Sequence, residues 1–499
     1  MSRPNIIFII TDQQRADTIG AWGCDYMTTP HMDRLAREGV SFTNAFCPGA
    51  TCVASRAAIF TGMYPHNTGV YAFQDWSQHR NWVHDLKEAG YWCANIGKMH
   101  LEAQGVDDGF HERIKVENPT NKQRENGGGD DDWGRFLAHH GQERPNNRNF
   151  TDPQWLQKYQ GVPWHLEERF HSDVFIGDAA VGWIDSWQGD KPLFLEVGFT
   201  GPHEPWDPLE RHLDMYKDRE LPPAVQRQGE LDNKPPQHRA HQEAFIHTRG
   251  EAQIDLTGAS AEDIAEMRRH YYAKITTVDE QLGKVLDALE RKGLLENSLL
   301  VFCSDHGEML GDHQMAYKWL MYDSITRIPL VVCDFRAESN RPQGTVDELV
   351  SLMDIGPTFL EAAGVEAATY LEGNSLAPYL GRDDTGFAPR DWVFCEDNYQ
   401  IMMRGKTHKL VYYIGQAEGE LYDLAQDPHE LDNLWDSPDH QELKTQMRLQ
   451  LLEWLAASTY WNAGYRQTRN QHYKLRWPGA DRALHGPMPE DGGVRTVGL

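Results

Sequence analysis

Runs of apolar residues that end in charged or polar side chains recur along the chain, with longer amphipathic segments between them. The short apolar runs predict buried strands of a parallel sheet, and the longer segments predict helices. We expect strands near residues 4–10, 92–97, 193–199, 298–303 and 329–333, and helices near residues 52–61, 168–187, 261–292 and 351–363. This alternation predicts an α/β fold, in which helices flank both faces of a large, mostly parallel sheet.

The pattern changes after the sequence Arg382-Asp383-Asp384-Thr385-Gly386. Short strands are expected there near residues 392–396, 400–404 and 408–413, followed by a helix near residues 438–457 and a tail of little periodicity over residues 461–499. We therefore predict a large catalytic domain over residues 1–386. Residues 387–499 are predicted to form a smaller α+β subdomain with an antiparallel sheet, a packing helix and the tail.

Two long polar stretches, residues 115–165 and 205–255, interrupt the α/β alternation. Long loops inside a compact enzyme usually form lids or rims, so we expect substrate selection there. Several tryptophans in these stretches either line the substrate site or pack beneath the loops, and the sequence leaves both alternatives open. These residues are Trp133, Trp155, Trp164 and Trp206.

Two of the predicted strands end in side chains that suit a metal ion. Asp12 follows the first strand, and Asp305 and His306 follow the strand near residues 298–303. The carboxyl ends of parallel strands form the ligand crevice of an open α/β sheet, so these residues are expected at one edge. Two buried carboxylates repel each other without a cation, and hard divalent ions prefer oxygen ligands. We favour a metal site over simple turn or helix-cap roles.

Further basic and imidazole side chains lie close to other predicted strands. They are Lys98 and His100 after the strand near residues 92–97, His203 after the strand near residues 193–199, and Lys318 before the strand near residues 329–333. Prolines on both sides of His203 restrict its loop and could fix the position of the ring. Each of these residues alone is also typical of exposed surface.

The segment Cys52-Val53-Ala54-Ser55-Arg56 resembles the signature Cys-x-(Pro/Ala)-x-Arg. Formylglycine-generating enzymes read this signature in the type I sulfatases of the alkaline phosphatase superfamily. The resemblance runs from about residue 4 to about residue 455, and the order of candidate residues along the chain is similar to that of the family. This order is Asp12, Cys52, Arg56, Lys98, His100, His203, Asp305, His306 and Lys318.

The resemblance implies an alkaline phosphatase-like fold and the hydrolysis of a sulfate ester, either a small alkyl or aryl sulfate or a sulfated sugar. Formylglycine made from Cys52 would be the cofactor and nucleophile, and a formylglycine-generating enzyme would be the maturation partner. The implied metal ligands are Asp12, Asp305, His306 and the oxygen of the modified Cys52. We expect one divalent ion, calcium first, with manganese as the alternative.

Two departures from the family pattern bear on the metal. Gln13 stands where many members carry a second aspartate, and His306 stands where asparagine is common. This variant looks like the choline-sulfatase and phosphonate-monoesterase branches, some of which favour manganese. An imidazole nitrogen also suits a transition metal better than calcium.

The resemblance implies a role for each remaining residue. Lys98 and Lys318 would clamp the sulfuryl oxygens with preorganised charge, and Lys318 would also assist the leaving group. His203 would protonate the leaving oxygen, and His100 would take a proton from the second hydroxyl of the hydrated formylglycine. Arg56 would hold the formylglycine with its rigid guanidinium.

Two other functions stay open. A phosphonate monoesterase or phosphodiesterase can use the same scaffold, because both reactions need a metal-bound nucleophile and a tetrahedral oxyanion site. The segment from Gly97 to His100 favours sulfate, since the phosphonate branch commonly lacks the Lys-x-His pair. The third alternative is a non-catalytic metal- or anion-binding relative in which Cys52 is never converted.

Composition and charge limit which binding partners and which cellular compartment we expect. The 499 residues carry a net charge of −27, which argues against nucleic acid or an anionic membrane surface as the main partner. No apolar run reaches transmembrane length, and the first strand begins too early for a signal peptide, so we expect a cytoplasmic protein. Seven cysteines without metal-finger spacing fit reduced thiols. A homo-oligomer is among the expected partners.

Overall fold

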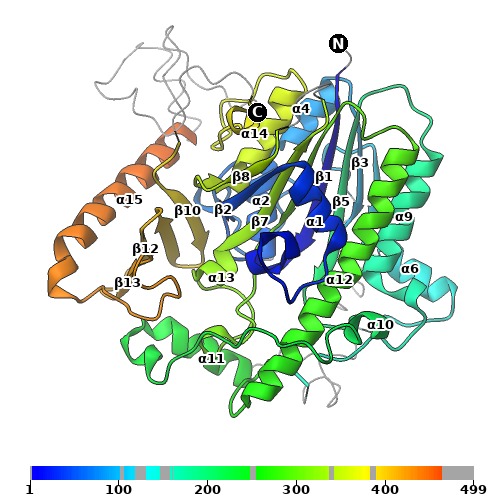
Figure 1. The fold of residues 1–499 in the computed structure, drawn as a ribbon. Helices are drawn as coiled ribbons and strands as arrows, with labels where there is room; N and C mark the ends of the chain where they lie inside the picture. The colour runs from blue at the N-terminus through cyan, green and yellow to red at the C-terminus, as the bar shows by residue number, and fades with distance from the viewer. Residues whose placement is uncertain are drawn as a thin grey trace, which may run out of the picture.

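The computed structural model describes residues 3–72, 74–101, 106–117, 131–145, 158–159, 161–247, 254–336, 342–381 and 389–462. Two sheets organise this part of the chain (Figure 1). The large sheet contains β1 (Asn5–Asp12), β2 (Val40–Phe46), β3 (Trp92–Gly97), β4 (Glu112–Lys115), β5 (Leu193–Pro202), β6 (Ser298–Ser304), β7 (Arg327–Asp334), β8 (Gly344–Val346) and β9 (Val350–Ser351). The small sheet contains β10 (Val393–Asp397), β11 (Gln400–Arg404), β12 (His408–Tyr413) and β13 (Gly419–Asp423).

The large sheet is mostly parallel, as the sequence predicts. Its strand order is β4-β3-β5-β1-β6-β7-β2-β8, with β9 paired to β2. Only the pairs of β7 with β6 and with β2 are antiparallel among the described strands of this sheet. The five strands expected from the apolar runs are all present in it, whereas β2 and the short strands β4, β8 and β9 were not expected.

Helices cover both faces of the large sheet (Figure 1). The helices of the described chain are α1 (Pro30–Glu38), α2 (Cys52–Thr61), α3 (Pro65–Thr68), α4 (Trp82–Glu88), α6 (Asp132–His139), α9 (Ser172–Ser186), α10 (Glu210–Leu213), α11 (Pro236–His247), α12 (Ala261–Arg291), α13 (Asp323–Thr326), α14 (Ile355–Ala362) and α15 (Gln441–Asn462). The expected helix over 351–363 is a short 3₁₀ turn, Leu352–Asp354, that continues into α14.

Alternate side chains of β1 enter two separate cores. Ile6, Phe8 and Ile10 pack into one core, whereas Ile7 and Ile9 pack into the other. Successive side chains of a strand point to opposite faces, so a strand buried on both faces is apolar throughout. This explains the continuous apolar run at the N-terminus and places β1 in the centre of the sheet.

The centre of the sheet determines where the acidic residues lie. β1 pairs in parallel with β6, and the pairing extends to Thr11 opposite Ser304. Asp12 and Asp305 are the next residues along these two strands, so the register brings both carboxylates to the same sheet edge. On the other side of β1, the end of β5 leads to the loop that carries His203.

The small antiparallel sheet packs against α15, on one side of the large sheet (Figure 1). Its core includes Phe394, Leu410 and Leu421 from the strands and Trp454 from α15, with the rings of Phe394 and Trp454 stacked at 3.9 Å. The strands β10, β11 and β12 and the helix α15 were predicted from the sequence, whereas β13 was not. The predicted boundary at residue 386 lies outside the described residues, and so does the tail from residue 463, so this division stays a prediction.

The long polar stretches contain short helices and buried aromatic residues. Trp133 and Trp206 are buried in the second core, and the indole nitrogens of Trp133 and Trp164 donate hydrogen bonds to the carbonyls of Phe170 and Glu167. These three tryptophans therefore pack beneath the loops, which was one of the two expected alternatives. Trp155 lies outside the described residues, as does most of the stretch from residue 118 to residue 157.

Candidate active site

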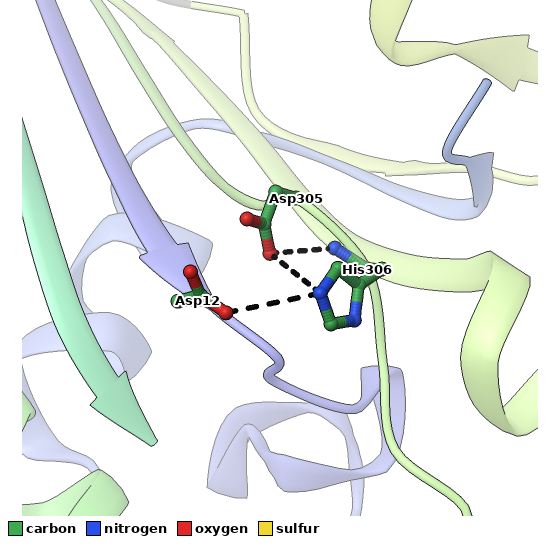
Figure 2. A group of neighbouring side chains, drawn as sticks. All are labelled: Asp12, Asp305 and His306. Atoms are coloured by element: carbon green, nitrogen blue, oxygen red, sulfur yellow. Dashed lines mark hydrogen bonds and ion pairs between the residues drawn. The ribbon is translucent and has the colours of Figure 1, made fainter. Parts of the chain in front are cut away.

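Asp12, Asp305 and His306 form a buried cluster at the ends of β1 and β6 (Figure 2). One ligand atom from each residue lies within 4.8 Å of the others. Nε2 of His306 is 3.7 Å from Oδ1 of Asp12 and 3.7 Å from Oδ1 of Asp305. The side chains of all three residues are fully inaccessible to solvent. The expected metal ligands from two distant segments therefore meet at one point.

The ring of His306 is oriented with one nitrogen toward the cluster. Its Nδ1 lies 2.8 Å from the carbonyl oxygen of Gly307, which assigns the ring proton to Nδ1 and leaves the lone pair on Nε2. Oδ1 of Asp305 accepts hydrogen bonds from the backbone N–H groups of Gln13, at 3.0 Å, and His306, at 2.9 Å. Such orientation of a ligand histidine and carboxylate is typical of metal sites.

Arg56 fixes the cluster to helix α2. Its Nε donates to Oδ2 of Asp305 at 2.7 Å, and its Nη1 donates to the carbonyl oxygen of Lys98 at 2.7 Å. The hydroxyl of Ser55 donates to the carbonyl oxygen of Asp305 at 2.6 Å. Although burial disfavours the charged form, Asp305 and Asp12 keep the pKa of Arg56 raised. The guanidinium is a permanent cation that holds the strand end and the helix together.

Cys52 is the first residue of α2 and is buried beside two lysines. Nζ of Lys318 lies 3.5 Å from Sγ of Cys52 and 3.3 Å from Nε2 of His306, so it links the cysteine to the acidic cluster. Burial raises the pKa of the thiol, but Lys318 and Lys98 outweigh it, so the net shift is downward. This surrounding of cations favours an anionic group at position 52.

Asp12 lacks hydrogen-bond donors for its two carboxylate oxygens, although the carboxylate is fully buried. Nζ of Lys98 lies 2.6 Å from Oδ2 of Asp12 and forms an ion pair with it, but not in hydrogen-bond geometry. Burial alone would raise the pKa of Asp12, but Lys98, His203, Lys318 and Arg56 together hold it well below its usual range. The carboxylate is therefore ionised and has room in its coordination for a further cation.

His100 lies at a bend after β3, and not on an extended strand with Lys98. Its φ is 59°, and its backbone N–H donates to Oε2 of Glu117 at 2.7 Å. Gly97 before it has a φ of 108°, and a side chain there would collide with the carbonyl oxygen of Gly198 on β5. Burial, with a contribution from Lys98, lowers the pKa of His100 to about 4. The ring is neutral near pH 7 and can accept a proton.

His203 lies just after β5, with about a fifth of its side chain exposed. Its Nδ1 lies 2.8 Å from the carbonyl oxygen of Glu204, and its ring meets the ring of Tyr317 edge-on at 5.9 Å. Burial and the charge of Lys318 lower the pKa of His203 well below its usual value. The structure thus brings His203 to the same side of the site as Lys318.

Three residues near Lys318 belong to the site but were not predicted from the sequence as site residues: Gln13, Glu204 and Glu308. The side chain of Gln13 accepts from Nζ of Lys318 at 3.0 Å and donates to Oε2 of Glu204 at 2.9 Å and Oε2 of Glu308 at 2.5 Å. Glu204 and Glu308 lie next to the predicted motifs at His203 and at Asp305–His306. This proximity is the sequence feature that could have indicated them as site residues. Burial raises the pKa of Glu308 to about 7.

The small sheet also reaches the active site. Oγ1 of Thr51 donates to Oδ2 of Asp397 at 2.6 Å, and the side-chain amide of Gln400 donates to the carbonyl of Trp319 at 2.6 Å. Burial raises the pKa of Asp397 to about 7. The residues before Cys52 and after Lys318 are thus held by β10 and β11, which no local pattern of the sequence predicts.

Comparison with known families shows to which family a chain with this site belongs. A family model described as Sulfatase matches residues 4–365, and a model of the C-terminal region of N-sulphoglucosamine sulphohydrolase matches residues 311–457. The chain belongs to the sulfatase family. Sulfatases are sulfuric ester hydrolases of the alkaline phosphatase superfamily, and both the expected family and the expected enzyme class are therefore confirmed.

Similar proteins support this family assignment, and each match covers nearly the whole length of this chain. An arylsulfatase of Clostridium perfringens is 30% identical, and the match covers 88% of this chain and 92% of the relative. An N-acetylglucosamine-6-O-sulfatase of Bacteroides thetaiotaomicron is 27% identical over 90% of this chain and 86% of its own. The crystal structure of the phosphonate monoester hydrolase of Agrobacterium radiobacter has a TM-score of 0.75 and 24% identity, covering 91% of this chain and 96% of that one; it supports the fold alone.

The residues of the sulfatase fit the divalent metal that the family implies. Two carboxylates and one imidazole converge, the oxygens of Asp12 lack donors, and Nε2 of His306 is directed at both acids. Oxygen ligands suit calcium and manganese, and a neutral imidazole joins them more readily around manganese. In the described part of the chain, we find no helix with the length and apolarity needed to cross a membrane.

Proposed function

We propose that this sulfatase hydrolyses its ester with a formylglycine made from Cys52 as the nucleophile. The observation that carries the proposal is the position of Cys52 at the start of α2, beside Lys318 and next to the cluster of Asp12, Asp305 and His306. The matching signature up to Arg56 supports recognition by a formylglycine-generating enzyme as the maturation partner.

Asp12, Asp305, His306 and the modified Cys52 would hold one divalent ion, calcium first and manganese as the alternative. When bound, such an ion supplies Lewis-acid stabilisation of negative charge and favours a deprotonated hydroxyl. Arg56 forms an ion pair with Oδ2 of Asp305 and so orients this carboxylate. The fully buried position of these residues excludes bulk water, which strengthens each electrostatic contact.

Lys98 and Lys318 would bind the sulfuryl oxygens. Both ammonium groups are buried and lie against the acidic cluster or Cys52, so their charge is already in place before the ester arrives. His203 would donate a proton to the leaving oxygen, because about a fifth of its side chain is exposed and can meet an entering ester. His100 would accept a proton from the nucleophile residue for release of inorganic sulfate, because its ring is neutral.

Phosphonate monoester or phosphodiester hydrolysis is the second candidate activity. It is favoured by the cluster of two acids and one histidine, because this ligand set resembles that of the phosphonate-monoesterase branch. The Lys98–Asp12 ion pair favours sulfate, because it keeps the cation of the Lys-x-His segment inside the site. A non-catalytic anion-binding role would leave the buried cations around Cys52 without a use.

For the alcohol half of the substrate we propose a small sulfate ester or a sulfated saccharide. The named relatives support both classes, since one is an arylsulfatase and another acts on N-acetylglucosamine-6-sulfate groups by its name. A cytoplasmic location, a homo-oligomer, the absence of nucleic-acid or membrane partners and the domain boundary at residue 386 remain proposals from the sequence.

The test combines mass spectrometry with an activity screen. The protein is co-expressed with a formylglycine-generating enzyme, and the peptide that contains Cys52 is weighed. Loss of about 18 mass units, the change from thiol to aldehyde, together with sulfate release from 4-nitrophenyl sulfate or a sulfated sugar, would support the proposal. A modified peptide that cleaves only phosphonate esters would favour the second candidate, and an unmodified thiol without turnover would favour the binding role.

A further inference from the structure

Glu204 lies directly beside Nδ1 of the His203 ring. Nδ1 of His203 is 2.8 Å from the backbone carbonyl of Glu204 and 3.3 Å from Oε2 of its carboxylate. Both neighbours of Nδ1 are acceptors, so this nitrogen carries a proton. Nε2 is therefore the nitrogen that can deliver a proton elsewhere. Glu204 sets this arrangement with two oxygens, its backbone carbonyl and its carboxylate, which both face Nδ1.

The carboxylate of Glu204 is itself held in place. Its side chain is 1% exposed, and Oε2 accepts a hydrogen bond from Nε2 of Gln13 at 2.9 Å. Gln13 also accepts from Lys318, so one amide connects the ammonium group of Lys318 with the carboxylate beside His203. A buried carboxylate costs free energy unless its charge is used or compensated, and burial raises the pKa of Glu204 accordingly.

The backbone around Glu204 is anchored to helix α12. Nζ of Lys274 donates to the carbonyl oxygens of His203, at 3.1 Å, and Pro205, at 2.8 Å, and to Oδ1 of Asp207 at 2.6 Å. Lys274 is buried, so these contacts are protected from water. The carbonyls on either side of Glu204 are thus fixed, which leaves the carboxylate little freedom to move away from the imidazole.

We infer that Glu204 is a positioning residue for the leaving-group step, which holds the His203 ring through Nδ1 so that Nε2 is available to the leaving oxygen. The inference rests on the proposed function, because it requires His203 to be the acid. When the bond from sulfur to the leaving oxygen breaks, its electron pair stays on that oxygen, which takes the proton from Nε2. The ring becomes neutral and regains a proton from water in the next cycle.

The charge of Glu204 has a second consequence for this step. Burial and Lys318 both disfavour the protonated ring of His203, whereas Asp12 and the backbone carbonyl of Glu204 favour it. The carboxylate of Glu204 lies 3.3 Å from Nδ1, where a negative charge also favours the protonated ring. Glu308 contributes a second carboxyl group on the other side of Gln13, and the phenol of Tyr317 contacts Glu204. Removing the carboxylate charge should therefore weaken proton donation while leaving nucleophilic attack intact.

The test uses the full-length, formylglycine-bearing, metal-loaded protein and two substrates. Glu204→Gln should lower kcat/KM for an alkyl sulfate by about tenfold to hundredfold, the usual cost of losing the partner that orients a functional histidine. With 4-nitrophenyl sulfate the loss should stay below about threefold, because nitrophenolate leaves without a proton. Glu204→Asp, which keeps the charge, should recover part of the alkyl sulfate activity. Glu210→Gln at the exposed start of α10 is the matched control and should behave as wild type.

A double-mutant cycle separates positioning from a structural role. In a His203→Ala background, Glu204→Gln should cost less than about twofold further, because its effect passes through the missing ring. Equal losses for both substrates, or a full additional loss in the His203→Ala background, would overturn the inference. A formylglycine-bearing wild type that releases no sulfate from either ester would instead overturn the proposed function, and the inference with it.

Discussion

Asp12, Asp305 and His306 lie at the ends of neighbouring central strands and are completely buried, whereas His100 and His203 lie on loops and are partly open to solvent. We call the first group the strand-end half of the site. The loop half consists of Lys98, His100, His203 and Lys318. The two halves meet at Cys52, which Lys318 contacts from the loop half.

The two halves are held in place by different physical means. The register of β1 with β6 places the strand-end half, and Arg56 secures it with buried hydrogen bonds. The loop half depends on unusual backbone conformations, with positive φ at His100 (59°) and at both neighbours of Lys318, Tyr317 (79°) and Trp319 (78°). Such conformations cost free energy and persist only where surrounding contacts enforce them. We therefore expect the strand-end half to govern nucleophile and metal, and the loop half to govern substrate-dependent steps.

Replacing the residue at which the halves meet should have the largest effect. Cys52→Ala removes the only side chain that can become formylglycine at this position, so sulfate release should fall by on the order of a million-fold, the scale of losing a covalent nucleophile. Sulfate release from 4-nitrophenyl sulfate measures the effect, with Cys24→Ala, a buried cysteine of the second core, as the control. Turnover that survives in Cys52→Ala would show that the reaction does not use residue 52 as the nucleophile.

Damage to the strand-end half should remove the metal and weaken the fold together. Asp305→Asn deletes a ligand charge and the partner of the buried Arg56, so bound metal should fall to background and the free energy of unfolding by about 3 kcal/mol. Elemental analysis and denaturant titration measure the two effects, and exposed Asp25→Asn is the control. Unchanged metal content would exclude Asp305 from the metal shell.

Damage to the loop half should instead depend on the substrate. His203→Ala should lower kcat for alkyl sulfates by about a hundredfold to ten-thousandfold and hardly affect 4-nitrophenyl sulfate, because only the alkoxide needs a proton to leave. The measurement is kcat over a series of esters with increasing leaving-group pKa. If all esters lose activity equally, His203 does not act as the acid, and the loop half has a general binding role.

The contact between the nucleophile turn and the small sheet should matter less. Thr51→Val removes the hydrogen bond to the buried Asp397, so the free energy of unfolding should fall by about 1–2 kcal/mol. Denaturant titration measures this against Thr257→Val, an exposed threonine in a loop. A loss no greater than in the control would mean that β10 only lies beside the nucleophile turn without stabilising it.

The difference between the halves also explains what the sequence could predict. Apolar runs that end in Asp12 and Asp305 disclose both the strands and the edge where the acids meet, because parallel strands end together. The contacts of Gln13 with Glu204 and Glu308 join residues 191 and 295 positions apart, and the contact of Thr51 with Asp397 joins residues 346 positions apart. No local periodicity encodes such pairs. β13 and the strand β2 were missed for a related reason, since short, mixed polar strands follow their partners more than their own pattern.

The change of kcat with pH should be the smallest of these effects. It tests whether His100, in the loop half, keeps its lowered pKa during turnover. Burial lowers the pKa of His100 to about 4, so the neutral form that accepts a proton persists when the pH falls from 7.5 to 5.5. At saturating metal, kcat for 4-nitrophenyl sulfate should then change by less than about twofold, whereas a histidine with the ordinary pKa near 6.5 would lose about tenfold of its basic form. The decline should begin only as the pH approaches 4. A tenfold fall at pH 5.5 would mean that His100 titrates like an ordinary histidine during turnover, and that its surroundings after β3 do not lower its pKa.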